Sequence, residues 1–502
     1  MYEYFFKIVS IYNGDYMKNK SIWLDNISRE KYPKLDNDIE CDILIIGGGI
    51  TGICCGYFLK DYNKKVILVE GNKICTGTTA KSTGKLTYLQ DDMIDKIKNI
   101  YDKETALKYV SSQREAIRLV KKIIIDNNIK CNLDSVNSYI FNNNIFNNNK
   151  IKNNYSILKD LVNIKKKRKL PIKTKCHKAL EVNDTFVFHP VKFVVALTKI
   201  ISNNIDIYEN TRVLNIEKEN GYFLANTKSG KIKTKRLILA CHYPFFFFPY
   251  LFPFKTGIEK SFLCASEINK TKQFSAINVD KEVLSIRYHK DKKNYLLIAG
   301  ESNSLDKNKN DIEKKDNIIW NMKSNFSPNI KYCWSNHDIM TSDHIPLIGK
   351  IDENLYLATG YNTWGMTNGI IAGKIISDII LNRENQYIEL FNPMRDFKNI
   401  PKLVNYNLEN SLSFIKTKLC KNKDFYRKDV KIVKENGIYY GIYIDENKKE
   451  HKVLNTCPHM KCNLSFNYQT KTWDCPCHGS SFDIDGNVIY GPSTYNIKIS
   501  NR

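Results

Sequence analysis

The chain has 502 residues, enough for two or three domains, and its net charge of +24 would suit nucleic acid, an anionic membrane or an acidic redox partner. Lysine is abundant throughout, so the charge fits a biased composition better, and no nucleic-acid recognition motif is present. Three prolines interrupt the most apolar window, 237–254, which excludes a transmembrane helix there. The N-terminus lacks a signal-peptide pattern, and most of the fourteen cysteines lack the regular spacing of a disulfide framework. We therefore expect a cytoplasmic protein.

A polar leader, residues 1–38, precedes a glycine-rich turn between a strand and a helix. Residues 41–46 form an apolar run typical of a buried strand, and Gly-Gly-Gly-Ile-Thr-Gly follows directly at 47–52. A helix and then a second strand, 66–69, are expected next. A glycine motif in this setting predicts a dinucleotide site, and the alternative is a structural turn.

The glycines and the acid after the second strand have distinct physical roles. Gly47 permits the tight turn, Gly49 lets backbone N–H groups approach a pyrophosphate, and Gly52 lets helix and strand pack closely. Glu70 ends the second strand, where its carboxylate suits a ribose hydroxyl and would repel a 2′-phosphate. The sequence therefore favours a dinucleotide that lacks a 2′-phosphate.

Several further segments carry candidate functions. Hydroxyl and glycine residues crowd the loop 77–87, whose alternative is an ordinary hydrophilic loop. The basic run 165–169 is expected to be a solvated helix end. Two apolar strands follow, at 237–240 and 284–287, and the second ends in Arg287. This arginine is either an exposed strand residue or a bidentate ligand for a carboxylate.

The segment 343–367 adds a third motif to the glycine turn and the loop 77–87. It reads D-x-x-P-x-I-G, then a strand, then A-T-G-Y-x-x-W-G-M-T before a helix expected from Asn368 to about Leu381. Together with the glycine turn and the loop 77–87, it closely resembles FAD-dependent oxidoreductases of the D-amino-acid oxidase and glycine oxidase type. The resemblance implies FAD as the dinucleotide and a helix N-terminus directed at the flavin pyrimidine edge.

The same resemblance implies roles for single residues. Loop hydroxyls would contact phosphate, Lys85 would stabilise the reduced flavin, the Val213 backbone would meet the adenine, and Arg287 would bind a substrate carboxylate. No covalent flavin link and no catalytic acid or base can be identified. The residues predicted to contact FAD are Gly47, Gly48, Gly49, Ile50, Thr51, Gly52, Glu70, Gly71, Thr78, Thr79, Ser82, Thr83, Lys85, Val213, Ala240, Gly360, Trp364, Gly365, Met366 and Thr367.

Near the C-terminus, two short motifs each supply one cysteine and one histidine. Cys457 and His459 form a C-x-H pair, and Cys475 and His478 form a C-x-x-H pair. Two such pairs on separate loops suit a [2Fe–2S] cluster in which the cysteines hold one iron and the histidines the other. A zinc site closes with four ligands and leaves two further cysteines of the motif unexplained. A zinc knuckle and a disulfide scaffold remain the alternatives.

The complete pattern, C-x-H-x-x-C and then C-P-C-H-G-S, resembles the Rieske domains of respiratory proteins. The resemblance implies a disulfide between Cys462 and Cys477 and ligand histidines that face outward as a docking surface. Ser480 matches the family, but Phe482 stands where a tyrosine usually donates a hydrogen bond to a cluster sulfur. Loss of this donor predicts a potential in the lower half of the family range, roughly −150 to +300 mV.

We therefore expect an α/β FAD-binding, Rossmann-like domain with an inserted mixed α+β substrate domain, followed by a small all-β Rieske domain with a hairpin signal at 435–437. The whole resembles bacterial fusions of these two modules. The expected boundaries are 39–395 for the oxidoreductase (FAD-binding parts about 39–90, 187–244 and 335–391; substrate parts about 91–186 and 245–334), 396–425 for a linker and 426–502 for the Rieske domain.

These expectations define one function with two alternatives. FAD would oxidise a small amine or amino acid, and one [2Fe–2S] cluster would carry the electrons singly to an unidentified acceptor. Alternatively, electrons enter through the cluster and the flavin reduces a substrate, or the protein is a redox sensor or carrier. No nucleic acid is expected as a partner, and the oligomeric state cannot be read from the sequence.

Overall fold

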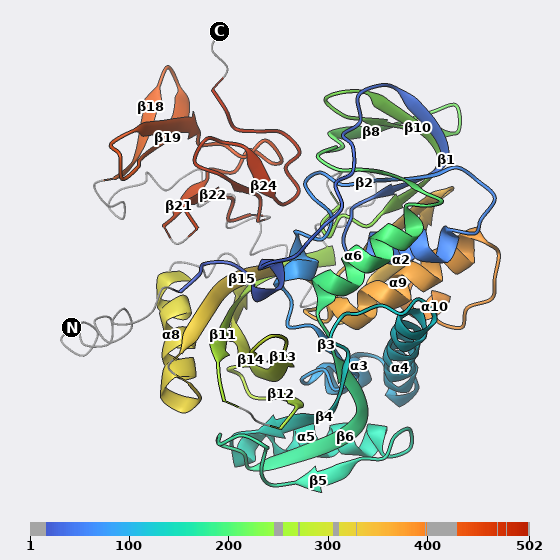
Figure 1. The fold of residues 1–502 in the computed structure, drawn as a ribbon, viewed down its shortest axis with the longest axis vertical. Coiled ribbons are helices and arrows are strands. Elements are labelled where there is room, and N and C mark those ends of the chain that lie inside the picture. The colour runs from blue at the N-terminus through green and yellow to red at the C-terminus, as the bar shows by residue number, and fades with distance from the viewer. Residues whose placement is uncertain are drawn as a thin grey trace.

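The computed structural model describes residues 17–244, 255–269, 272–304, 311–327, 329–396, 398, 429–468, 470–477 and 479–499. Two large sheets and their helices form the part before residue 398, and two small sheets form the part after 429. In Figure 1 the C-terminal strands, in orange and red, gather at the upper left, apart from the helices. The expected succession of an α/β domain with an α+β insertion and an all-β domain is confirmed.

The first sheet is mainly parallel, and its central strands are buried on both faces. Its elements are β1 (Ile39–Ile46), α2 (Ile50–Leu59), β2 (Val66–Val69), α6 (Pro190–Ile201), β7 (Asp206–Tyr208), β8 (Asn215–Glu219), β9 (Tyr222–Asn226), β10 (Lys231–Leu239), β16 (Leu347–Asp352), β17 (Leu355–Thr359) and α9 (Gly365–Ile380). The strand order is β16-β17-β10-β1-β2-β7, and β8 and β9 extend from β10. Figure 1 shows α2, α6 and α9 side by side. Strands buried on both faces read as continuous apolar runs, which is why β1 and β2 could be located from sequence.

The second sheet carries the inserted part. Its strands are β3 (Lys85–Leu86), β4 (Asp134–Asn142), β5 (Lys165–Lys167), β6 (Lys178–Val187), β11 (Thr256–Glu267), β12 (Phe274–Asn278), β13 (Leu284–Lys290), β14 (Asn294–Ser304) and β15 (Ile330–Thr341). The order is β15-β11-β14-β13-β12-β4-β6-β3, with β5 on β6. The accompanying helices are α3 (Met93–Ile100), α4 (Lys103–Asp126), α5 (Asn148–Leu158), α8 (Asp311–Asn325) and α10 (Ile388–Phe391), with 3-10 turns η1 (Ile22–Leu24), η2 (Thr78–Lys81) and η3 (Ile145–Asn147).

Two expectations about this sheet need correction. The basic run at 165–169 is not a helix end: β5 is an exposed edge strand, and charged edge strands resist further pairing. All of β15 pairs in this second sheet, although residues from 335 onward were expected in the FAD-binding part. The domain boundaries otherwise remain predictions, and most of the expected linker lies outside the described residues.

The described end of the leader packs onto the body of the protein. Trp23, within η1, is fully buried, and its indole Nε1 donates to the Ser82 carbonyl oxygen at 2.7 Å. The sequence offered a signal that was missed, because an isolated large aromatic residue rarely stays in water. Residues 17–38 therefore help to hold the loop that follows β2.

The C-terminal domain is all-β. Its strands are β18 (Val430–Glu435), β19 (Ile438–Ile444), β20 (Glu450–Leu454), β21 (Ser465–Asn467), β22 (Thr472–Asp474), β23 (Ser481–Phe482) and β24 (Val488–Tyr490). The predicted hairpin is confirmed: Asn436 and Gly437 join β18 to β19 with φ of 48° and 81°. Trp473 is fully buried at the centre, and a Cβ at Gly441 would lie 2.4 Å from its ring.

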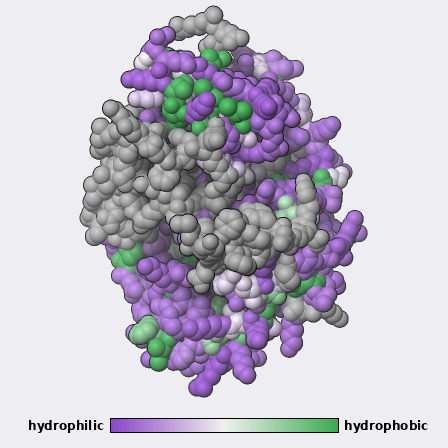
Figure 2. Space-filling model, turned by 90° about the vertical axis from the view of Figure 1, so that its left-hand side faces the viewer, coloured by the Kyte–Doolittle hydropathy of each residue, from purple (hydrophilic) through white to green (hydrophobic). Residues whose placement is uncertain are grey.

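The surface agrees with the composition. On the side of the molecule shown in Figure 2, the described residues are mostly hydrophilic, and hydrophobic areas are small. None of the helices in the described part of the chain combines the length and hydropathy that a bilayer crossing requires. The cytoplasmic location remains a prediction.

Candidate active site and cluster site

A cavity of about 990 Å³ is lined by residues from both large sheets. It brings together most of the residues predicted to contact FAD. Lys85, Gly360, Thr367 and two of the turn glycines are not among its lining residues. Those that do line it are Gly47, Gly49, Ile50, Thr51, Glu70, Gly71, Thr78, Thr79, Ser82, Thr83, Val213, Ala240, Trp364, Gly365 and Met366.

The turn between β1 and α2 needs its glycines. Gly47 has φ of +116°, and a Cβ there would lie 2.5 Å from the Ala240 carbonyl oxygen. A Cβ at Gly52 would lie 1.9 Å from the Gly47 carbonyl oxygen, so α2 sits directly against the turn. The Thr79 hydroxyl accepts a hydrogen bond from Ile50 N–H at 3.0 Å and ties the following loop to the helix start. The backbone at the cavity edge therefore carries no side chain at these glycines and is held by a hydrogen bond to the following loop.

Glu70, at the end of β2, is held by the backbone. Its two carboxylate oxygens accept hydrogen bonds from the N–H groups of Gly48 and Asn72, both at 2.8 Å. Burial raises the pKa of Glu70, while these two N–H groups and the Arg212 charge act in the opposite direction. A carboxylate has about four acceptor positions, so capacity remains for a ribose hydroxyl. Arg212 lines the cavity and was missed, although it directly precedes Val213.

The segment before α9 supplies an unsatisfied donor. Trp364 is 7% exposed and lines the cavity, and its indole Nε1 has no hydrogen-bond partner among the described residues. Buried donors are nearly always paired, so an acceptor group belongs beside this indole. Gly365 and Met366, the first residues of α9, line the cavity as well. The glycine turn at 47–52, the hydrogen-bonded Glu70 carboxylate and the unsatisfied Trp364 indole together fit FAD.

Two predicted residues lie behind the cavity wall. The Lys85 ammonium donates to the Ala276 carbonyl and the Ser285 hydroxyl, both at 2.7 Å, and burial holds its pKa well below the ordinary value. Arg287 is fully buried, and its Nη1 donates to the carbonyl oxygens of Thr83, Gly84 and Phe188 at 2.7 to 3.1 Å. Its guanidinium fixes the loop after β2 and, as placed here, does not face a substrate. Lys81, in the same loop, lines the cavity instead.

The cluster loops bury the two predicted cysteine ligands side by side. Cys457 and Cys475 are 1% and 2% exposed and their thiols are hydrogen-bonded to each other. The N–H groups of His459 and Met460 and the Ser480 hydroxyl also hydrogen-bond the Cys457 sulfur. Such donors stabilise a thiolate, so this set fits a cysteine-ligated iron. The fourth predicted ligand, His478, lies outside the described residues.

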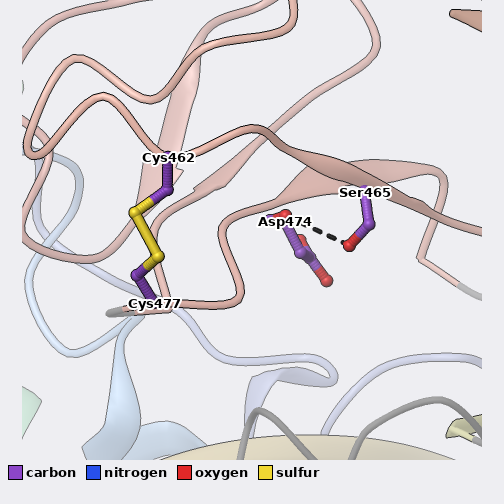
Figure 3. Close-up of a disulfide and its surroundings, with 4 residues drawn as sticks. All are labelled: Cys462, Ser465, Asp474 and Cys477. Atoms are coloured by element: carbon purple, nitrogen blue, oxygen red, sulfur yellow. Dashed lines mark hydrogen bonds between the residues drawn. A yellow bond between two sulfur atoms is a disulfide. The ribbon is translucent and has the colours of Figure 1, made fainter. Parts of the chain in front are cut away.

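A disulfide joins the two loops. Cys462 and Cys477 are bonded, as Figure 3 shows, and their sulfurs lie within 4.8 Å of the Cys475 sulfur. In the same view, the Ser465 hydroxyl donates to the Asp474 carbonyl at 3.3 Å and ties β21 to β22. Because both disulfide sulfurs are committed to each other, neither is available as a metal ligand.

The C-terminal domain forms part of the cavity wall. Residues 488–491 and Thr494 of this domain line the cavity together with the glycine turn. The Tyr490 hydroxyl hydrogen-bonds Nδ1 of His242, and its ring stacks on His337 with centroids 5.5 Å apart. The Lys81 ammonium lies 5.6 Å from the centre of the Tyr490 ring. No local sequence signal could have identified Tyr490, because its partners are distant in the chain.

The domain contact also covers a predicted cluster ligand. The His459 ring meets the Tyr243 ring edge-on, with centroids 6.4 Å apart and planes at 89°. Thr494 Oγ1 donates to the Leu214 carbonyl at 2.9 Å, and Asn72 Nδ2 donates to a carbonyl of β24 at 3.2 Å. The expectation that this histidine faces an outside partner is therefore wrong for this arrangement: it faces the chain's own oxidoreductase domain.

Comparison with known proteins agrees with both sites. The family model "FAD dependent oxidoreductase" matches residues 42–379, and the model "Rieske [2Fe-2S] domain" matches residues 416–500. The chain is 30% identical over 498 residues to the Rieske 2Fe-2S iron-sulfur protein YhfW of Bacillus subtilis (strain 168), covering 95% of this chain and 97% of that protein. It is 21% identical over 376 residues to gamma-glutamylputrescine oxidoreductase of Escherichia coli (strain K12), covering 70% and 85%.

Among solved structures, glycine oxidase from Geobacillus kaustophilus superposes with a TM-score of 0.59 at 13% identity, over 71% of this chain and 99% of that one. At this identity the likeness concerns the fold alone. The two family matches identify the cofactors, which are FAD for the first domain and a [2Fe–2S] cluster for the second. The chain therefore belongs to the family of FAD-dependent oxidoreductases and carries a C-terminal Rieske domain as its second redox centre.

Proposed function

We propose that this oxidoreductase dehydrogenates a small amine or amino acid and delivers the electrons, one at a time, to its own Rieske cluster and then to an external acceptor. The observation that carries the proposal is the contact between the domains. His459, a candidate cluster ligand, packs against Tyr243, and the residues just before Tyr243 line the flavin cavity. A cluster held there lies beside its electron source, so no separate carrier is needed between them.

The proposed ligands follow from the buried donor set. Cys457 and Cys475 hold one iron, His459 and His478 hold the other, and the neighbouring disulfide braces the loops. FAD lies with its pyrophosphate at the β1–α2 turn and its ribose at Glu70. When bound, the flavin accepts two electrons and the cluster accepts one, which suits the two groups to serial use.

The contribution of the cluster domain to the cavity wall supports a dehydrogenase rather than an oxidase. Tyr490 contacts His242, His337 and Lys81, so a side chain of the cluster domain forms part of this wall. A wall made by the acceptor domain narrows the path by which oxygen can reach the flavin. We therefore expect little peroxide from the complete enzyme.

The substrate class is proposed from the names of similar proteins. One relative is named for the oxidation of gamma-glutamylputrescine and one structural neighbour for the oxidation of glycine, an amine and an amino acid. Arg287, bonded to backbone carbonyls, is proposed to position the loop 82–84 and not to bind the substrate. Both substrate classes offer a carbon-bound amino group, which a flavin can oxidise.

Anaerobic stopped-flow mixing of the holoenzyme with amines and amino acids tests the proposal. With an effective substrate, flavin absorbance should bleach first and cluster absorbance second. In Cys475→Ser the flavin phase should persist and the cluster phase should disappear.

Two outcomes would contradict it. If a reduced donor fills the cluster before the flavin and no amine or amino acid bleaches the flavin, the electrons flow in the opposite direction. If wild-type enzyme in air releases peroxide as fast as Cys475→Ser, the cluster is not the acceptor of the flavin's electrons.

A further inference from the structure

One face of the second sheet forms a cavity wall that presents two carboxylates side by side. Successive residues of a strand point to opposite faces, so Glu259 and Ser261 of β11 share a face, as do Asn336 and Asp338 of β15. The strand register pairs Glu259 with Asp338 and Ser261 with Asn336, and all four residues line the cavity. The two acids are therefore opposite neighbours on adjacent strands.

This wall carries more acceptors than its own donors satisfy. Asn336 Nδ2 donates to Asp338 at 3.2 Å, and the Ser302 hydroxyl donates to Glu259 at 2.9 Å. Asn336 is 5% exposed, and its carbonyl oxygen has no hydrogen-bond partner in the described part of the chain. Burial and then the Glu259 charge raise the pKa of Asp338 to about 7. Two carboxylates and an unsatisfied carbonyl thus converge on the cavity.

The cation nearest this wall is shared with other acids. The charge of Lys96, on α3, interacts with Asp91, Asp92 and, less strongly, Glu259, and its ammonium pairs with Asp92 at 2.6 Å. Lys260 and His337 occupy the adjacent strand positions and therefore point to the opposite face of the sheet. Lys281 and Asp91 also line the cavity, and the charged neighbours of Asp91 are Lys96 and Asp92. The surplus of acceptors remains with Glu259, Asp338 and the carbonyl of Asn336.

We propose that Glu259, Asp338 and Asn336 form a subsite for a second, protonated amino group of the substrate. The inference rests on the proposed amine oxidation and narrows its substrate class to diamines and other amines with a remote cationic group. An ammonium donates three hydrogen bonds, which matches two carboxylates and one carbonyl oxygen. A substrate held there by one end presents its other amino group elsewhere in the same cavity for oxidation.

Single-turnover reduction of the holoenzyme tests the subsite. The probes are 1,3-diaminopropane, 1,4-diaminobutane and 1,6-diaminohexane, each beside the monoamine of the same chain length. The concentration dependence of the flavin reduction rate separates Kd from the limiting rate. We expect the best diamine to bind at least about ten-fold more tightly than its monoamine, because a charge-assisted contact is lost in the monoamine.

Variants assign the preference to the acids. Glu259→Gln and Asp338→Asn should each raise Kd for the diamine by about ten-fold and leave Kd for the monoamine unchanged. Glu267→Gln is the matched control, because Glu267 lies on the same strand, pairs with Lys293 at 2.9 Å and does not line the cavity. A variant that merely disturbs the fold would change the limiting rate for both amines.

Failure of the subsite and failure of the proposed function are distinguishable. Equal Kd values for diamines and monoamines that both reduce the flavin overturn the subsite alone. If no amine or amino acid reduces the flavin, the proposed function fails, and diamine binding is read from the shift of the oxidised flavin spectrum. A diamine shift that Glu259→Gln and Asp338→Asn both leave unchanged then overturns the subsite as well.

Discussion

Single hydrogen-bond donors around the cluster tune its affinity for electrons. The Ser480 hydroxyl is fully buried, accepts from Ser493 N–H at 3.0 Å and hydrogen-bonds the Cys457 sulfur. Ser480→Ala is expected to lower the midpoint potential of the cluster by about 20–65 mV. This range equals a hydrogen bond of about 0.5–1.5 kcal/mol, with 59 mV for each tenfold change in a one-electron equilibrium. Redox titration followed by electron paramagnetic resonance measures it.

The converse substitution provides the control. Phe482 is fully buried on β23, where the family usually supplies a second donor, so Phe482→Tyr should raise the potential. Phe466→Tyr adds the same hydroxyl elsewhere in this core and should leave the potential unchanged. An unaltered potential in Ser480→Ala would show that the hydroxyl does not act on the cluster.

The hydrogen bond between Tyr490 and His242 predicts a pH dependence of domain docking. Burial, and then the Lys81 charge, lower the pKa of His242 from 6.5 to about 4, so the docked imidazole is neutral and accepts from the phenol. As pH falls from 6.5 towards 4, an undocked His242 takes up a proton that the docked one does not, and docking weakens. Electron transfer from photoreduced flavin to the cluster should therefore be constant above pH 6.5 and slow progressively below it.

Tyr490→Phe separates this bond from the titration of His242. The variant should transfer electrons more slowly at neutral pH and keep the decline below pH 6.5, because burial and the Lys81 charge still lower the pKa of His242. His337 stacks on the same ring, and burial lowers its pKa as well. Phenylalanine is therefore the suitable substitution at position 490, because it keeps the ring that covers His337. Tyr495→Phe removes a hydroxyl from an exposed tyrosine of the same domain and should behave as wild type. A wild-type transfer rate in Tyr490→Phe at neutral pH would contradict the role of this hydrogen bond.

At the scale of elements, the sequence predicted the local structure of the glycine turn but not which polar side chains would be buried. The β1–α2–β2 unit was predictable because its turn requires glycines within a few residues of each other. Lys85 and Arg287 have residue types suited to a flavin and a carboxylate, yet both are buried against backbone carbonyls that only the folded sheet brings near. Lys81, four residues before Lys85, lines the cavity instead, and a loop of unknown path gave no means of choosing between them.

Two glycines of the FAD-binding region should respond differently to the same substitution. A Cβ at Gly52 would lie 1.9 Å from the Gly47 carbonyl oxygen, whereas a Cβ at Gly77 would meet nothing within 4 Å. Gly52→Ala should therefore force α2 away from the turn, destabilise the protein by about 1–3 kcal/mol and abolish flavin retention. Gly77→Ala should keep the Tm of the wild type, because its Cβ meets no protein atom within 4 Å. Flavin absorbance per protein and the Tm measure both effects, and flavin-replete Gly52→Ala would contradict the packing argument.

At the scale of the whole molecule, the arrangement of the two domains decides what the cluster can reach. Each domain was predictable because its motifs are compact in sequence, 47–52 for one and 457–480 for the other. The interface was not, because it joins β24 and Thr494 to Asn72, Leu214 and His242 through contacts with no local pattern. In the structure, this interface places His459 against Tyr243, at the wall of the chain's own cavity.

A covalent lock tests whether this docked arrangement serves internal electron transfer alone. Asn72 donates to the backbone of Ile489 at 3.2 Å, and both side chains are exposed, so Asn72→Cys with Ile489→Cys should form a disulfide across the interface. The locked enzyme should still pass electrons from flavin to cluster, because His459 stays against Tyr243. Reduction of a protein acceptor should fall at least about ten-fold, since the covered histidine cannot meet it, and a reductant should restore the rate. The reduced double variant is the matched control, and full acceptor reduction by the locked form would mean that electrons leave the cluster by another face.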